Sequence, residues 1–105
     1  MITTRLIVKK EFFDQIKSGQ KKEEYRSDSM KYAKQFANWS QNGKVFEGFK
    51  PIDAVIFQNG YTKESITVSC EKIELVEWWN SIPAGFKKGQ TCYVLTLGEI
   101  IEAAL

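Results

Sequence analysis

The densest cluster of side chains that could do chemistry lies at residues 18–26, which read SGQKKEEYR. A lysine that is partly desolvated in a cleft can act as a base or nucleophile, whereas in water it is only a cation. Glu24 and Arg26 are two residues apart, so a strand places them on one face, where they can pair and orient an amide edge or a phosphate of a ligand. The alternative interpretation is that Lys21, Glu24 and Arg26 form a surface ion-pair set of little energetic weight.

The composition excludes several kinds of catalytic and metal-binding site. The chain has no histidine, which excludes Ser-His-Asp and Cys-His catalysis, Cys/His zinc sites and histidine general bases. Cys70 and Cys92 lie in apolar, β-branched runs, where we expect small core residues rather than a disulfide or a catalytic thiol. We predict no metal and no cofactor.

The charge is distributed unevenly along the chain. The formal net charge is +2, but residues 1–50 carry eleven Lys+Arg against six Asp+Glu, and residues 51–105 carry four against seven. A basic first half can attract a phosphate backbone, and it is equally the pattern of an ordinary solvated surface.

The spacing of apolar residues predicts the helix and strands that hold the cluster at residues 18–26. Alternation of apolar residues predicts a strand from Ile2 to Val8, and an apolar stripe of Phe12, Phe13 and Ile16 predicts a short helix over 11–18. Gly19 is placed to end that helix, and a short polar strand is expected over 22–26. The cluster therefore follows a helix end and enters a strand.

The remaining elements are predicted in the same way. Asp28 or Ser29 can cap a second helix that ends near Trp39, with Met30, Ala33, Phe36 and Ala37 on its buried face. Strands are expected over 52–57, 66–75 and 91–97, with turns at 42–43 and 59–60. The apolar phase slips between Cys70 and Ile73, which predicts a β-bulge near residues 71–72.

A chain of 105 residues predicts one domain over residues 1–105. The order of elements indicates an α+β fold with a small, barrel-like sheet of five or six strands and two or three short helices. A doubly wound parallel sheet is not expected, because strictly alternating βα units are absent.

The sequence also resembles a known family. Gly19, Lys21, Glu24 and Arg26 fit G-x-K-x-x-E-x-R, the signature of the activating-signal-cointegrator homology (ASCH) domains, which are related to the PUA fold of RNA-modifying enzymes. The preceding TRLIVKKEFFDQIKSG resembles the strand and helix that come before the motif in that family, and the later strands are similar in pattern. The chain thus looks like a small, single-domain member of bacterial or phage type.

This resemblance implies a PUA-like barrel that binds RNA, a nucleotide or a nucleoside in a cleft beside the motif. The implied ligand-binding residues are Gly19, Lys21, Glu24 and Arg26. Tyr61, next to the Asn59-Gly60 turn, can add a stacking surface for a base, although the turn alone explains the Asn-Gly pair.

The resemblance also implies an alternative function, that of a hydrolase. One branch of small ASCH proteins removes the acetyl group of N4-acetylcytidine with the motif lysine and a threonine at the motif's glutamate position. In this chain Lys21 would be the base or nucleophile, and Glu24 stands where that branch has the threonine. The carboxylate that would complete an amidohydrolase or ribonuclease site could be Glu71, Glu74 or Glu77.

A third alternative is a protein-only regulatory or phage-encoded interaction partner. Trp39, Trp78 and Trp79 provide aromatic surface that can stack on bases or simply cover the core, and Lys87 and Lys88 form a basic loop tip. The opening MITTRLIVKK has no signal-peptide pattern and no run has the length of a membrane span, so we expect a cytoplasmic protein with no membrane association.

Overall fold

The computed structural model describes residues 1–104, which form two helices and seven strands. In chain order these are β1 (Thr3–Val8), α1 (Lys10–Lys17), β2 (Glu23–Ser27), α2 (Met30–Phe36), β3 (Ala37–Ser40), β4 (Val45–Phe49), β5 (Ala54–Asn59), β6 (Ser65–Glu77) and β7 (Thr91–Ala104). Five strands form one sheet in the order β1-β5-β6-β7-β2, and β3 pairs with β4 in a second sheet. The predicted α+β class, the five-stranded sheet and the two helices are confirmed.

The chain divides into two compact units, each built from several segments. The first contains residues 1–24, 51–72 and those from Thr96 onward, and the second contains residues 25–50 and 73–95. Strands β6 and β7 contribute residues to both. In β6 the division falls between Lys72 and Ile73, where the apolar phase of the sequence slips. The assignment of the whole chain to one domain stays a prediction.

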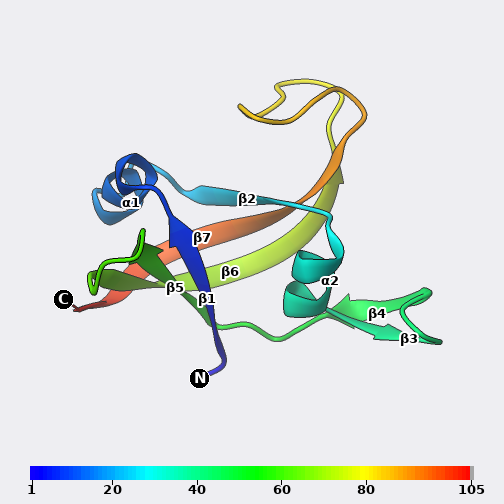
Figure 1. Cartoon of the computed structure of the whole chain (residues 1–105), viewed down its shortest axis with the longest axis horizontal. Helices are drawn as coiled ribbons and strands as arrows, with labels where there is room; N and C mark the ends of the chain where they lie inside the picture. Colours follow the sequence, from blue (N-terminus) through cyan, green and yellow to red (C-terminus); the bar gives the residue numbers. More distant parts are fainter. Residues whose placement is uncertain (105) are drawn as a thin grey trace. The chain divides into compact units, whose positions relative to one another are not determined.

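The first unit is built around the pairing of β1 with β5. The two strands run parallel, in a register that places Leu6 opposite Phe57 and Val8 opposite Asn59, and Figure 1 shows them side by side. Along β1, Leu6 and Val8 are buried whereas Ile7 is exposed, which is the alternation of a strand with one buried face. The core of this unit is completed by apolar side chains from the helix and the other strands: Phe13, Ile16, Ala54, Val55, Phe57, Ile66, Val68 and Leu97.

Helix α1 ends as the sequence predicts, but its buried face is narrower. Phe13 and Ile16 are buried, whereas Phe12, predicted to share their face, is exposed. Gly19 has a φ of +81°, the left-handed conformation that glycine adopts with little strain after a helix end. Its amide donates to the Ile16 carbonyl at 3.1 Å, so the helix stops where the charged cluster begins.

The second unit corrects the prediction for the second helix. Ser29 is its N-cap by position, but its side chain makes no capping hydrogen bond. The helix ends at Phe36 rather than near Trp39, Ala37 already belongs to β3, and Met30 is 73% exposed instead of buried. The hairpin of β3 and β4, drawn beside α2 in Figure 1, was not predicted beyond its turn at Asn42-Gly43.

Aromatic side chains form the interior of the second unit. Phe36 contacts Tyr93 edge to face with ring centroids 5.5 Å apart, and Phe49 contacts the same tyrosine at 6.5 Å. Phe46 then contacts Phe49 at 5.1 Å, so the contacts continue from a fully buried ring to one that is 43% exposed. Such edge-to-face pairs contribute beyond the apolar area that they bury. Of the helices in the described part of the chain, neither is long and apolar enough to cross a membrane.

Gly98 in β7 is placed where a larger residue does not fit. The hydroxyl of Ser69 accepts a hydrogen bond from the Glu99 amide at 2.9 Å, and a Cβ on Gly98 would overlap that hydroxyl and lie 3.0 Å from Glu71 Oε1. An alanine would therefore force Ser69 to rotate and give up its hydrogen bond.

We predict that Gly98→Ala lowers the free energy of unfolding by about 1–2 kcal/mol, because crowding and a lost hydrogen bond outweigh the usual gain from replacing a strand glycine. Urea unfolding followed by circular dichroism measures the change. Adding Gly98→Ala to a Ser69→Ala protein should cost much less, since the hydroxyl is then gone. A Gly98→Ala protein more stable than the wild type would contradict the prediction.

Candidate functional site

The segment that follows α1 is held by main-chain hydrogen bonds on both sides of Lys21. The Lys21 amide donates to the Gln15 carbonyl at 3.0 Å, and the Lys22 carbonyl accepts from the Leu97 amide at 2.8 Å. The first bond fixes the segment to the helix, and the second fixes it to β7. The main chain at Lys21 and Lys22 is therefore held by backbone contacts that do not involve the two side chains.

Lys21 and Glu24 form an ion pair that is largely shielded from water. Lys21 Nζ lies 3.4 Å from Glu24 Oε1, and their side chains are 17% and 7% exposed. The ring of Phe12 covers the amine, with its centroid 5.7 Å from Nζ, which explains the exposed position of that phenylalanine. The interpretation of these two residues as a solvent-exposed surface pair is wrong, since Glu24 as a whole is 5% exposed.

A cavity of about 230 Å³ lies beside this pair, within the first unit. Its lining comes from α1, the segment after it, β6 and β7: Ile16, Lys17, Ser18, Gly19, Lys21, Lys22, Val68, Leu97, Gly98, Glu99 and Ile100. Ile16, Val68 and Leu97 are buried and give the cavity an apolar floor. The cavity therefore combines an apolar floor with three lysines.

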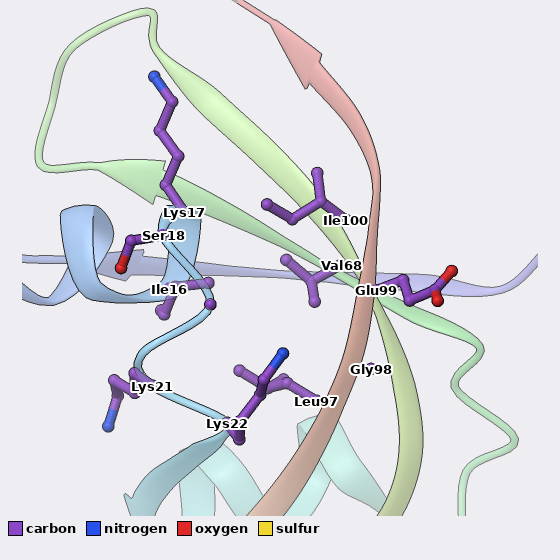
Figure 2. Close-up of a pocket in the computed structure, with 11 residues that line it drawn as sticks. Ile16, Lys17, Ser18, Lys21, Lys22, Val68, Leu97, Gly98, Glu99 and Ile100 are labelled. Carbon is purple, nitrogen blue, oxygen red and sulfur yellow. The ribbon is translucent and has the colours of Figure 1, made fainter.

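The lysines around the cavity point in different directions (Figure 2). The Lys22 amine points toward the space between Ile16, Val68 and Leu97, whereas the side chains of Lys21 and Lys17 point away from it. Lys17 Nζ lies 3.5 Å from Glu64 Oε2, and Lys21 is paired with Glu24. Within residues 1–104, the Lys22 amine has no ion-pair or hydrogen-bond partner. Lys22 is exposed, and Glu99 also lines the cavity, but among the described residues no ion pair joins the Lys22 amine to a carboxylate.

Two parts of the cavity were not expected from the sequence, namely Lys22 and the residues of β7. The polar strand expected over 22–26 would include Lys22, but β2 begins only at Glu23, so the alternation of a strand does not extend to this lysine. Gly98, Glu99 and Ile100 were outside the predicted elements, because the last strand was expected to end at Leu97. The available signal was the apolar pair Ile100-Ile101, which continues the strand pattern beyond the glycine.

The other predicted site residues lie elsewhere. Arg26 belongs to the second unit, where its Nη1 donates to the Tyr32 hydroxyl at 2.9 Å and its guanidinium lies 5.5 Å from the centroid of that ring. Tyr61 is 93% exposed and does not line the cavity. Glu71 is exposed and belongs to the first unit.

Glu74 and Glu77 belong to the second unit. Glu74 lines a separate hollow there, and Glu77 accepts a hydrogen bond from Trp79 Nε1 at 2.7 Å. None of the three carboxylates considered for a hydrolase is among the residues that line the cavity beside Gly19.

The described residues do not favour a catalytic thiol or a metal site. Burial raises the pKa of the Cys70 thiol, and burial likewise raises the pKa of the Cys92 thiol, whose sulfur accepts a hydrogen bond from Trp78 Nε1 at 2.9 Å. A thiol with a raised pKa is a poor nucleophile near neutral pH. Within residues 1–104, no group of three or more histidine, cysteine, aspartate or glutamate side chains is arranged to hold a metal ion.

Comparisons with known proteins add no assignment. No family model, no curated protein and no solved structure matches the chain.

We predict that Glu24→Gln lowers the free energy of unfolding by about 3 kcal/mol, because it leaves the shielded Lys21 amine without its carboxylate. Lys21→Met should destabilise the protein for the converse reason. The double variant Lys21→Met/Glu24→Gln should lose less than the two single changes together, and urea unfolding of the wild type and the three variants measures this coupling. Strictly additive losses would show that the two side chains do not act as a pair.

Proposed function

We propose that this chain is an ASCH-like protein with a PUA-like fold, and that it binds RNA or a nucleotide in the cavity beside Gly19. The proposal is supported by the G-x-K-x-x-E-x-R pattern together with its surroundings. The motif follows a strand and a short helix, turns at a left-handed glycine, and lies next to a cavity. Two of its residues, Lys21 and Glu24, form a shielded pair.

The observation that carries the proposal is the Lys22 amine. It points into a cavity with an apolar floor, and within residues 1–104 it has no carboxylate partner. A lysine in this position is suited to a phosphate or another anion, because its three donors and its charge are otherwise unused. Lys17 and Lys21 also line the cavity, but Glu64 and Glu24 balance their charges, so Lys22 is the lysine that would attract the anion.

The size and floor of the cavity indicate which part of a nucleic acid it takes. At about 230 Å³ it is smaller than the roughly 300–1,000 Å³ of sites for drug-sized ligands. It can therefore enclose part of one nucleotide unit, with the rest of the nucleotide outside it, rather than a longer segment. The phosphate would bind Lys22, and the sugar or base would cover Ile16, Val68 and Leu97, which gives affinity without sequence preference.

Binding is favoured over catalysis by the state of Lys21. An amine in an ion pair is a hydrogen-bond donor rather than a nucleophile, and Glu24 Oε1 lies 3.4 Å from Lys21 Nζ. Glu24 also stands where the deacetylating branch of the family has a threonine. Lys21 and Glu24 then act by shaping the segment that presents Lys22, and Gly19 by permitting its turn. Arg26 and Tyr61 stay predicted ligand contacts.

We predict weak, salt-sensitive binding of single-stranded RNA. One phosphate contact, made by the Lys22 amine, corresponds to a slope of about −0.7 for log K against log salt concentration. Lys22→Gln should weaken binding of an oligouridylate roughly tenfold at low salt and flatten the slope by about 0.7. Fluorescence anisotropy of a labelled oligonucleotide measures both.

The matched control is Lys63→Gln, which removes the same charge from an exposed position in the first unit that does not line the cavity. It should change the affinity by less than about twofold. Equal losses in Lys22→Gln and Lys63→Gln would reduce the effect to overall charge and contradict the proposed cavity.

Catalysis is tested with Lys21→Arg, which keeps the charge but removes the compact amine. We expect wild type and variant alike to release no acetate from N4-acetylcytidine and to leave a short RNA intact, while RNA binding by the variant changes only slightly. Turnover by the wild type that is lost in Lys21→Arg would establish a hydrolase instead, with Lys21 at its centre.

A further inference from the structure

A second concave surface lies in the second unit, next to the β3–β4 hairpin. It is a hollow of about 650 Å³ lined by Met30, Ala33 and Lys34 of α2, Trp39 of β3, and Asn42 and Gly43 of the turn that follows. This volume is within the range of sites that accept a small organic ligand. None of these residues belongs to the cavity beside Gly19.

The indole of Trp39 is held rigidly in the wall of this hollow. Its Nε1 donates to the Ala33 carbonyl at 2.9 Å, and its ring contacts Phe46 edge to face with centroids 5.4 Å apart. Phe46 is in turn packed on Phe49. A ring fixed in this way loses little conformational entropy when a flat ligand packs against it, so Trp39 is a preorganised aromatic surface.

The remaining lining residues combine flexibility, polarity and positive charge. Met30 is 73% exposed and can adapt its long side chain to a ligand. Asn42 and Gly43 have positive φ values of 59° and 83°, and the asparagine side chain carries both a hydrogen-bond donor and an acceptor. Among the described residues that line the hollow, Lys34 is the ionisable one and none is acidic.

We propose that this hollow is a second binding site, separate from the cavity beside Gly19, and that it takes a nucleotide, with the base against Trp39 and Met30 and the phosphate at Lys34. The charge of Lys34 favours a nucleotide over an apolar protein segment as the occupant of the hollow. A segment covering the hollow would bury the Lys34 amine without a partner, which is costly. A phosphate supplies that partner while the base covers the apolar wall.

The experiment uses adenosine 5′-monophosphate and the indole N–H resonances of ¹⁵N-labelled protein. The Trp39 resonance is identified by its loss in Trp39→Phe. We expect the nucleotide to shift this resonance saturably, and uncharged adenosine to bind roughly fivefold more weakly. Lys34→Gln should remove the difference between the two ligands.

The matched control is Lys31→Gln, because Lys31 is exposed on the same helix and does not line the hollow. It should keep the preference for the nucleotide. Lys22→Gln removes the amine on which the proposed site in the first unit depends, and it should leave the Trp39 shift unchanged. The two proposed sites can therefore be tested independently of each other.

Three results would overturn the proposal. The Trp39 resonance could stay unmoved by the nucleotide, or Lys31→Gln could weaken binding as much as Lys34→Gln does. The third is an uncharged apolar peptide that shifts the resonance at lower concentration than the nucleotide, which would identify the hollow as a docking surface for protein.

Discussion

The buried carboxylate of Glu24 is the constraint on which the arrangement of the motif depends. A charged group that is 5% exposed requires a partner, and Lys21 supplies one only if the chain turns sharply after α1. Gly19 permits that turn through its left-handed backbone. Beyond that turn the Lys21 side chain lies against Glu24, whereas the amine of the next residue, Lys22, points toward the cavity (Figure 2). A buried, paired charge and an unpaired one therefore lie next to each other in the segment after α1.

The parts of this arrangement that are local in sequence could be predicted. The alternation in β1, the apolar spacing of Phe13 and Ile16 and the glycine after the helix are short-range signals, and each appears in the structure. The motif itself identified Lys21 and Glu24, although the sequence left open whether they were exposed. That question is decided by packing, since Phe12, predicted to be buried, instead covers the Lys21 amine.

What could not be predicted depends on contacts between residues far apart in the chain. Ala37 follows Phe36 at a spacing that a helix would tolerate, but Lys50 donates its amide to the Phe36 carbonyl at 2.8 Å and Phe36 packs on Tyr93. These contacts of Phe36 favour a hairpin over a longer helix for residues 37–49. The β7 side of the cavity was not predicted because a glycine often marks the end of a strand. Gly98 instead lies inside β7, where any larger residue would overlap the Ser69 hydroxyl.

The burial of Cys70 and Cys92 has a consequence for how this protein responds to its surroundings. Thiols and imidazoles are the side chains that ordinarily titrate nearest to neutrality. The chain has no histidine, and burial raises the pKa of both thiols, so neither group alters the protein's charge between about pH 6 and 8. Neither kind of side chain would therefore make the proposed anion binding depend on modest acidification, whereas ionic strength would weaken it.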